Sequence, residues 1–396
     1  MKILIVNEKL IQGGTEIYCL NLKEILEKDK KNEVYLLTFD DNFEKNILNI
    51  KNKENILNVK LNSKLGKINK LLFNPFLYKK IKKEIDKVNP DKIVLNNIFY
   101  SPITQIKALK DYEIYQLVHD YSVVCPKSTC LKDDLSICKG YKYQKCSKEC
   151  LYHSSKWSIL FKLKLTKRME KIRKKYVKKF ISPSEKLNEY LKDYDYNSVS
   201  LNNPIRTINV QKSEKKNNAV KKFIYVGAIN ENKGIFRFLK AFNKFSTDKN
   251  VILEILGKPS SKEDELKLEE LIKNNKKIVN YGFVKNEEAL SKIERAHYMV
   301  VPSLWMENYP TTVLEAMMME TIVIASNRGG IPEMLDDNRG FLFDIMDDKS
   351  ILKELQKVYS LNEVEYSNIV ENGRKYIEDN NSFEKYSKKI NSILNQ

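Results

Sequence analysis

Short apolar runs alternate along this chain with longer stretches whose apolar residues recur at helical spacing. Four runs in the first half have the pattern of buried strands: residues 2–7, 33–38, 91–96 and 115–120. Helical patterns cover residues 17–26 and 65–88, whereas residues 42–63 are polar and irregular. Strands that alternate with helices in this way predict a parallel, doubly wound α/β sheet.

The same alternation resumes after residues 206–222, a polar stretch rich in Lys and Asn that has the composition of a linker. Further strands are predicted at residues 223–227, 251–257, 279–282, 299–301 and 322–326. Two such patterns in 396 residues predict two domains, residues 1–205 and 223–375, with a ligand in the cleft between them. Residues 376–396 are expected to form a C-terminal helix.

Composition points to a folded, intracellular protein. Hydrophobic residues make up 42 % of the chain, which is enough for two cores. The N-terminal apolar run turns polar too soon for a secretory leader, and no apolar stretch reaches the length of a spanning helix. We therefore expect a cytoplasmic protein.

The positive charge is concentrated in the first half. The net charge is +18; residues 1–205 hold 40 Lys and Arg against 24 Asp and Glu, and residues 206–396 hold 30 against 28. Residues 156–180 read as a basic amphipathic helix, which suits an anionic membrane surface. The alternative is a core helix with a solvated charged face. Nucleic acid is not expected as a partner, because no binding module for it is present.

Two carboxylates, Glu307 and Glu315, bracket a predicted strand–turn–helix in the last third of the chain. Pro310 fits the first turn of that helix, so the amides of Thr311 and Thr312 are expected at its N-terminus, where phosphate binds favourably. Acids beside an anion site suit a ligand with both hydroxyls and phosphates. Alternatively, the acids only cap the helix.

Three further positions have the character of ligand contacts. The turn at Gly13 and Gly14 would let backbone amides approach a ligand, although such a turn is often only a turn. His119 is predicted at the carboxyl end of a strand, where open α/β sheets bind ligands. Lys233 comes after a strand and just before a helix, within reach of a phosphate. A structural histidine and a solvated lysine are the alternatives.

Five cysteines gather in one segment, residues 125–153, which we expect to form an insertion beside the site. They are Cys125, Cys130, Cys138, Cys146 and Cys150. Their spacing matches no common zinc motif closely, although His153 is near, and disulfides would be unusual in the cytosol. Free thiols, a zinc site and a redox-labile loop all stay open.

Seven motifs, taken together, carry a resemblance to a known family. They are Gly13-Gly14-x-Glu16, His119-Asp120, Ser182-Pro183-Ser184, Gly227 with Lys233-Gly234, Val301-Pro302-Ser303, Glu307-x7-Glu315 and Gly329-Gly330-x-Pro332-Glu333. In this order and over nearly the whole chain, they resemble the retaining glycosyltransferases of family 4. That resemblance implies the GT-B fold, in which two Rossmann-like domains face a central cleft.

The resemblance also implies roles for these residues. A UDP- or GDP-sugar would bind mainly to the second domain and the acceptor to the first, with a C-terminal helix that crosses back to the first domain. Glu315 would bind the ribose, Lys233 the diphosphate and Glu307 the donor sugar. The turn that ends at Val284 would face the base, and His119 the sugar. Such enzymes need no metal or other cofactor.

Two departures from the family pattern affect the expected donor contacts. Ala228 stands where the family commonly has Arg, so part of the diphosphate clamp is missing or comes from elsewhere, for which Arg328 is a candidate. Tyr309 and Pro310 replace a common Phe-Gly pair, and Pro310 has no N–H to donate. We expect the sugar preference to depend on this segment.

The sequence therefore predicts a metal-independent, retaining hexosyltransferase that acts on a glycan or lipid-linked acceptor in cell-surface polysaccharide assembly. We expect it to be peripheral at the inner face of the cell membrane. A nucleotide-sugar epimerase on the same fold and a non-catalytic protein that binds polyanions or membranes are the alternatives.

Overall fold

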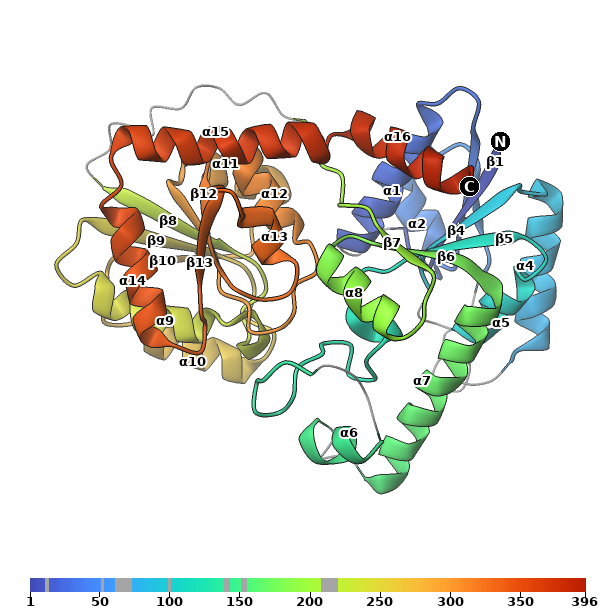
Figure 1. Cartoon of the computed structure of the whole chain (residues 1–396), viewed down its shortest axis with the longest axis horizontal. Coiled ribbons are helices and arrows are strands. Elements are labelled where there is room, and N and C mark those ends of the chain that lie inside the picture. The colour runs from blue at the N-terminus through green and yellow to red at the C-terminus, as the bar shows by residue number, and fades with distance from the viewer. Residues whose placement is uncertain are drawn as a thin grey trace. The chain divides into compact units, whose positions relative to one another are not determined.

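The structure is a computed structural model that describes residues 1–10, 14–50, 53–60, 73–98, 101–138, 143–150, 155–207 and 220–396. Contacts divide the chain into two compact units, each with its own sheet (Figure 1). Unit 1 comprises Met1–Asn202 and Glu384–Gln396, and unit 2 comprises Asn203–Phe383. The predicted two-domain α/β architecture is confirmed.

Among the described residues of unit 1, seven parallel strands form a sheet with the order β3-β2-β1-β4-β5-β6-β7. The strands are β1 (Lys2–Asn7), β2 (Glu33–Thr38), β3 (Ile56–Asn58), β4 (Lys92–Asn97), β5 (Glu113–Leu117), β6 (Val177–Ser182) and β7 (Ser198–Ser200). The central strands are apolar runs because helices cover both faces of a parallel sheet. Ile3, Leu4 and Ile5 of β1 are fully buried.

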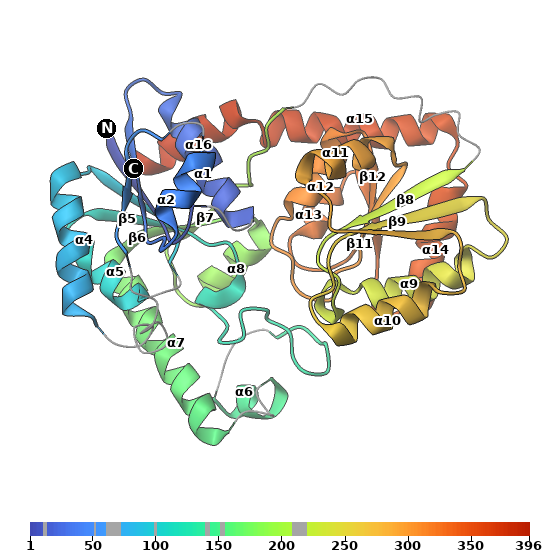
Figure 2. The same cartoon turned by 180° about the vertical axis from the view of Figure 1, so that it is seen from behind.

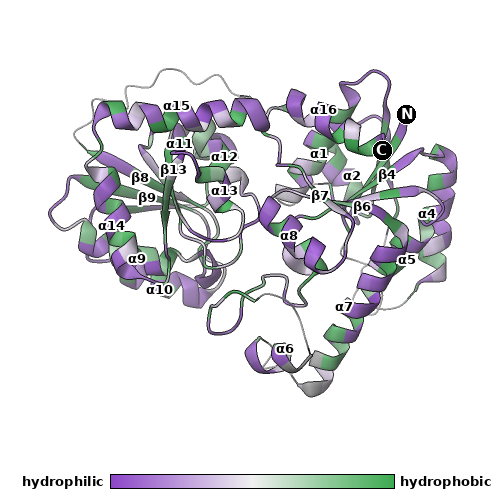
Figure 3. Cartoon of the chain, viewed as in Figure 1, coloured by the Kyte–Doolittle hydropathy of each residue, from purple (hydrophilic) through white to green (hydrophobic). Residues whose placement is uncertain are grey.

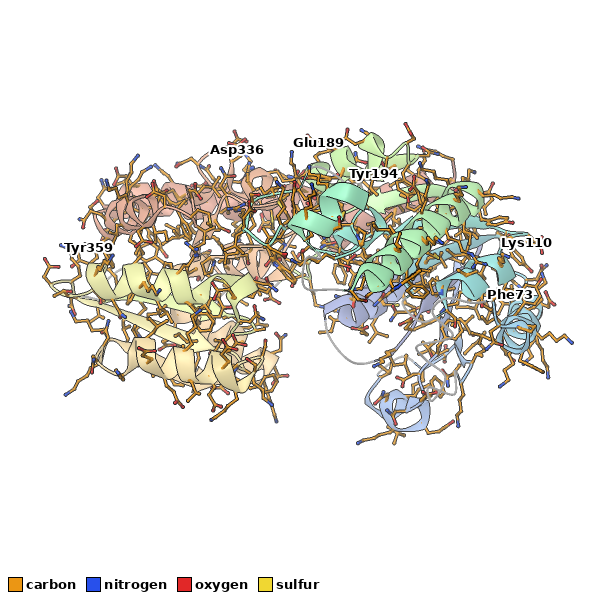
Figure 4. All side chains as sticks on the ribbon, turned by 90° about the horizontal axis from the view of Figure 1, so that it is seen from below. Phe73, Lys110, Glu189, Tyr194, Asp336 and Tyr359 are labelled. Atoms are coloured by element: carbon orange, nitrogen blue, oxygen red, sulfur yellow. The ribbon has the colours of Figure 1, made fainter. Side chains whose placement is uncertain are left out.

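Helices α4 (Pro75–Val88), α5 (Pro102–Ala108) and α7 (Lys156–Tyr176) pack in sequence against one another. α1 (Gly14–Glu27) and α16 (Phe383–Leu394) lie together on the other face of the sheet, as the reverse view in Figure 2 shows. Phe73 and Lys110 mark the α4–α5 side of unit 1 in Figure 4. The remaining helices of unit 1 are α2 (Phe43–Asn46), α6 (Tyr143–Glu149) and α8 (Glu185–Asp193).

Two predictions for unit 1 are wrong in detail. Residues 42–63 are not irregular throughout, because they contain α2, a short 3₁₀ turn and the edge strand β3. The basic helix ends at Tyr176 rather than at residue 180, because Val177 begins β6, which pairs with β5. A β-branched residue suits that strand better than the helix. For the predicted helix 65–88, residues 65–72 lie outside the described residues.

Six parallel strands form the sheet of the described part of unit 2, in the order β10-β9-β8-β11-β12-β13. The strands are β8 (Lys221–Val226), β9 (Val251–Leu256), β10 (Ile278–Gly282), β11 (Tyr298–Val301), β12 (Ile322–Ser326) and β13 (Gly340–Phe343). Strand β8 begins inside the predicted linker 206–222, of which residues 208–219 lie outside the described residues. Apolar colouring follows these strands in Figure 3.

Helices cover both faces of this sheet (Figure 1). One layer contains α9 (Ile235–Phe245), α10 (Lys262–Ile272) and α14 (Asp348–Tyr359), and the other contains α11 (Asn286–Arg295), α12 (Thr311–Met318) and α15 (Glu363–Asn380). α13 (Ile331–Leu335) precedes β13.

Residues 376–396 contain the end of α15 and the C-terminal helix α16. α15 continues to Asn380, and α16 starts at Phe383. Tyr386 and Ser387 of α16 bond to α1 through Tyr18 and the carbonyl of Ile25. No helix in the described part of the chain is long and apolar enough to cross a membrane.

Candidate functional site

Glu307 lies in the loop between β11 and α12, where one of its carboxylate oxygens accepts three hydrogen bonds. Lys233 Nζ lies 2.7 Å from Glu307 Oε1, and Ser303 Oγ and Trp305 Nε1 each donate to the same oxygen at 2.6 Å. Lys233 ends a short 3₁₀ turn after β8, whereas Ser303 and Trp305 follow β11. The structure thus joins two predicted site residues that are 74 positions apart.

The carboxyl of Glu307 is ionised at neutral pH. Burial alone would raise the pKa of Glu307, but the charge of Lys233 and the three hydrogen bonds hold that pKa below its ordinary value. The ammonium of Lys233 also lies 4.4 Å from the centre of the Trp305 ring, a cation–π distance. A fixed positive charge therefore stands beside a fixed carboxylate.

Two glycines allow the loops around this pair to approach closely. Gly234 follows Lys233 with φ +68°, and a Cβ there would lie 1.8 Å from the carbonyl oxygen of Pro302. Gly329 has φ +62°, and a Cβ there would lie 1.8 Å from the carbonyl oxygen of Glu307. Only glycine meets both requirements, left-handed backbone and close contact, at either position.

The helix after Glu307 begins one residue later than predicted. Pro310 is the N-cap of α12, with an extended ψ of 125°, so it precedes the first turn instead of lying in it. Thr311 and Thr312 are the first two helical residues, whose amides an α-helix leaves without intrahelical partners. This end of α12 has the expected character of an anion site.

Glu315, the second acid, lies in the following turn of α12. It is largely buried, and burial raises the pKa of its carboxyl to about 7. A carboxyl that titrates near neutrality can either accept or donate a hydrogen bond to a hydroxyl ligand. The helix-cap alternative does not apply to Glu315, because Pro310 occupies the cap position.

Tyr309 lies in the core of unit 2. Its side chain is 3 % exposed, its hydroxyl bonds to that of Tyr376 at 2.9 Å, and Asn381 Nδ2 donates to it at 3.2 Å. Its carbonyl accepts from Asn203 Nδ2 at 3.1 Å. The bonds to Tyr376 and Asn381 connect the loop before α12 to α15. The Tyr309 ring therefore holds this loop in place.

An apolar pocket of about 440 Å³ opens at the carboxyl ends of β8, β9 and β10. Its lining residues are Val226, Gly227, Ala228, Leu256, Gly257, Lys258, Phe283, Val284, Asn286 and Ala289. Val284 is thus one of its walls, and the ring of Phe283 beside it is 78 % exposed. A flat, apolar wall with an exposed ring suits a stacked heterocycle.

Ala228 lines the same pocket, so the cationic side chain of the family pattern is missing there. Arg328, the suggested substitute, follows β12 and is 9 % exposed. Its backbone N–H donates to the carbonyl of Ser326 at 2.8 Å. A phosphate contact from Arg328 stays a prediction.

In unit 1, His119 follows β5, at the carboxyl edge of the sheet. Its Nε2 lies 2.7 Å from Asn96 Oδ1, and the ring of Tyr18 from α1 meets it edge-on with centres 4.9 Å apart. Burial lowers the pKa of His119 to about 4, although Asp120 opposes the shift. The ring is therefore neutral at pH 7. Gly14 starts α1, and Gly13 lies outside the described residues.

The cysteine-rich segment has no disulfide among its described residues. Cys125, Cys130, Cys138 and Cys146 are buried, and Cys150 is half-buried. Residues 130 and 138 face each other in a hairpin, closed by a backbone bond of 2.8 Å. In the described ranges, no three His, Cys, Asp or Glu side chains are grouped so that they could hold a metal ion. His153 lies outside those ranges.

Sequence reasoning missed three polar residues of this arrangement: Ser303, Trp305 and Asn96. From the sequence, Ser303 is recognised only as part of a motif, and Trp305 is assigned no role. Asn96 carried a usable signal, because a polar residue at the end of a buried strand lies at the ligand edge of the sheet.

Comparison with known proteins links unit 2 to a family. Residues 207–376 match the family of glycosyl transferases group 1. The match lies wholly within unit 2 and includes Lys233, Glu307 and Glu315. No curated protein sequence is significantly similar to the chain.

Solved structures resemble the whole chain at low sequence identity. HepE from Anabaena, solved with UDP and glucose, is 14 % identical, with a TM-score of 0.73 over 100 % of this chain and 99 % of its own. Sucrose-phosphate synthase from Thermosynechococcus elongatus is 17 % identical, with a TM-score of 0.74 over 100 % and 98 %. The lipopolysaccharide outer core galactosyltransferase WaaB is 17 % identical, with a TM-score of 0.66 over 99 % and 98 %. These likenesses show that the predicted GT-B fold is correct.

Proposed function

We propose that this protein is a retaining glycosyltransferase that moves a hexose from a nucleoside diphosphate to a glycan or lipid-linked acceptor. The observation that carries the proposal is the Lys233–Glu307 pair at 2.7 Å, beside the N-terminus of α12. The group 1 match over residues 207–376 and the bound ligands of HepE support the same reaction class.

In this proposal, each part of the unit 2 site takes one part of the donor. The base stacks in the pocket beside Val284 and Phe283, and Glu315 bonds to the ribose hydroxyls. The diphosphate lies between Lys233 and the amides of Thr311 and Thr312. Since UDP and GDP both have flat bases, the pocket favours neither.

Charge stabilisation is the main catalytic contribution of these residues. As the bond between the sugar and the diphosphate breaks, negative charge develops on the leaving phosphate, and Lys233 with the α12 amides lies ready to stabilise it. Glu307 then orients the donor hydroxyls. Positive charge from the protein could serve without a metal ion, and treatment with a chelator tests this point: unchanged turnover is expected.

The decisive experiment measures nucleoside diphosphate release and sugar transfer with a panel of UDP- and GDP-sugars and a lipid acceptor extract. Lys233→Met and Glu307→Gln should each lower kcat/KM at least 100-fold, or about 3 kcal/mol. Lys267→Met is the matched control, because Lys267 also pairs with a carboxylate, Glu231 at 2.6 Å, and contacts a ring, Phe236 at 4.6 Å. Full activity of Glu307→Gln would refute the role given to Glu307.

We further propose that α7 holds the enzyme on an anionic membrane, where a lipid-linked acceptor is found. Leu163 and Met169 of α7 pack inward, whereas Trp157 is 82 % exposed and Phe161 50 % exposed. Exposed lysines follow on the same helix: Lys162, Lys164, Lys167 and Lys171. Exposed aromatic rings among cations suit the interface of anionic lipids.

A further inference from the structure

Asn96, at the carboxyl end of β4, joins three segments of unit 1. Its Nδ2 donates to Asn7 Oδ1 at the end of β1, at 2.9 Å, and to the carbonyl of Thr15 in the first turn of α1, at 3.0 Å. Its Oδ1 lies 2.7 Å from Nε2 of His119, which follows β5. Asn96 is 3 % exposed, so these bonds do not compete with bulk water.

The two bonds that Asn96 donates determine which ring nitrogen of His119 carries the proton. An amide nitrogen has two hydrogens, and here both have acceptors, so the group that faces His119 must be the amide oxygen. An oxygen can only accept, so Nε2 of His119 carries the proton. In a neutral ring, the lone pair then belongs to Nδ1.

Other groups also pack around His119 or act on its charge. The Tyr18 ring meets the imidazole at 74°, and the Tyr18 hydroxyl bonds to that of Tyr386 in α16. Asp120 is the nearest acid in the chain, and the buried guanidinium of Arg173 from α7 interacts with that carboxylate. Burial of His119 outweighs the attraction to Asp120, so the ring stays uncharged.

We propose that Asn96 is a positioning residue for His119, which fixes the ring as the Nε2–H tautomer and couples its orientation to the start of α1. If the proposed function holds, His119 meets its substrate as a neutral hydrogen-bonding group. Such a group suits sugar hydroxyls and does not add positive charge for a phosphate.

The test observes the imidazoles directly by long-range ¹H–¹⁵N NMR of the full chain, with a pH titration. The chain has three histidines, so replacement of each by Gln assigns the signals. His297 is an internal reference in unit 2, because its Nδ1 accepts from the Lys222 N–H at 3.0 Å. The wild-type protein should show His119 protonated at Nε2 alone at pH 7.

Two substitutions then separate positioning from mere packing. Asn96→Leu removes the acceptor, and His119 should become a mixture of tautomers, with His297 unchanged. Asn96→Asp keeps the shape but places a carboxylate next to Nε2, which should raise the pKa of His119 by about one unit or more. Asn97→Leu, at the neighbouring position of the same strand but on its opposite face, is the matched control and should leave His119 unchanged.

Either of two results would overturn the proposal: a wild-type ring protonated at Nδ1, or a His119 tautomer and pKa that both survive Asn96→Leu and Asn96→Asp. Neither readout needs transferase activity, so failure here is distinct from failure of the proposed function. Where activity is present, Asn96→Leu should lower kcat between about tenfold and 100-fold with little change in the donor KM. Asn96→Asp should move the acidic limb of the kcat/KM profile to higher pH.

Discussion

Lys233 and Glu307 are bonded to each other, with Nζ and Oε1 2.7 Å apart, although the proposed reaction assigns them to different parts of one substrate. The carboxylate holds the ammonium in place and also accepts from Ser303 and Trp305. A bound diphosphate would also accept a hydrogen bond from the ammonium of Lys233. The Glu307 carboxylate could then accept hydrogen bonds from the sugar hydroxyls. Donor binding would thereby be coupled to release of the Glu307 carboxylate.

The first prediction concerns stability. Lys233→Met leaves the carboxylate of Glu307 without its counter-ion in a buried loop, which should lower the free energy of unfolding by about 1–3 kcal/mol. The double variant Lys233→Met/Glu307→Gln removes the charge as well and should recover part of that loss. Urea unfolding of the two variants measures the difference. Additive losses would mean that the two residues are not coupled.

Trp305 offers a milder change to the same carboxylate. Trp305→Phe keeps an aromatic ring near Lys233 but removes the indole N–H that bonds to Glu307 Oε1 at 2.6 Å. We expect the pKa of Glu307 to rise and kcat/KM for the donor to fall roughly tenfold. That fall corresponds to the free energy of about one charge-assisted hydrogen bond. Steady-state kinetics with Trp157→Phe, an exposed tryptophan on α7, as the control checks this prediction.

Much of this arrangement is readable in the sequence, and the rest depends on contacts between distant segments. The sequence predicts Glu307 in a strand-to-helix loop and Lys233 just before a helix that follows a strand and a turn. Their mutual bond is not predicted, because it depends on the approach of two loops that Gly234 permits. Tyr309 shows a different limit of the sequence. Its position between Glu307 and the helix predicts a donor contact, which stays a prediction. Its bonds to Tyr376 and Asn381, residues far along the chain, show that its ring also packs in the core.

The fold was easier to predict than the boundaries of its elements. Buried parallel strands are continuous apolar runs, which a sequence displays directly. β3 was not predicted, because this edge strand is short and half-buried and has no such apolar run. The basic helix was extended past Tyr176 because Lys178 and Lys179 continue its charge pattern. In the structure, Lys178 pairs with Glu113 at 2.9 Å and Lys179 bonds to Gln396.

Gly234 tests the close approach of the loops. Gly234→Ala combines a strained φ of +68° with a clash at Pro302 and should destabilise unit 2 by roughly 2–4 kcal/mol. Gly282→Ala is the matched control, because Gly282 has the same φ of +68° but nothing within 4 Å of a Cβ. It should cost only about 1 kcal/mol. Equal losses in urea unfolding would show that the loop contact does not matter.

The raised pKa of Glu315 predicts that the stability of the protein depends on pH. Its folded pKa of about 7 exceeds the ordinary value of 4.5, so the folded state retains a proton that the unfolded state has lost between these values. Stability from this group is full below pH 4.5 and is lost as the pH rises through 7. The free energy of unfolding should therefore fall between pH 5 and pH 8. This fall should be larger for the wild-type protein than for Glu315→Gln. Equal differences would contradict the raised pKa.

The last prediction separates membrane binding from simple charge. Trp157→Ala/Phe161→Ala should weaken co-sedimentation with anionic vesicles, because it removes the apolar contact but leaves the net charge unchanged. Charge removal at Lys162, Lys164, Lys167 and Lys171 should weaken it further and reduce its salt dependence. Lys178 and Lys179 are poor targets, since both already have partners.

The control for these variants is a matched pair on unit 2. Phe283→Ala/Leu266→Ala removes two apolar side chains of unit 2 that are 78 % and 56 % exposed. It should leave vesicle binding intact, although Phe283→Ala should weaken donor binding at the pocket. If vesicle binding did not change in any α7 variant, or fell equally in the control, α7 would be only a core helix with a solvated charged face. The acceptor would then have to reach the enzyme without help from this surface.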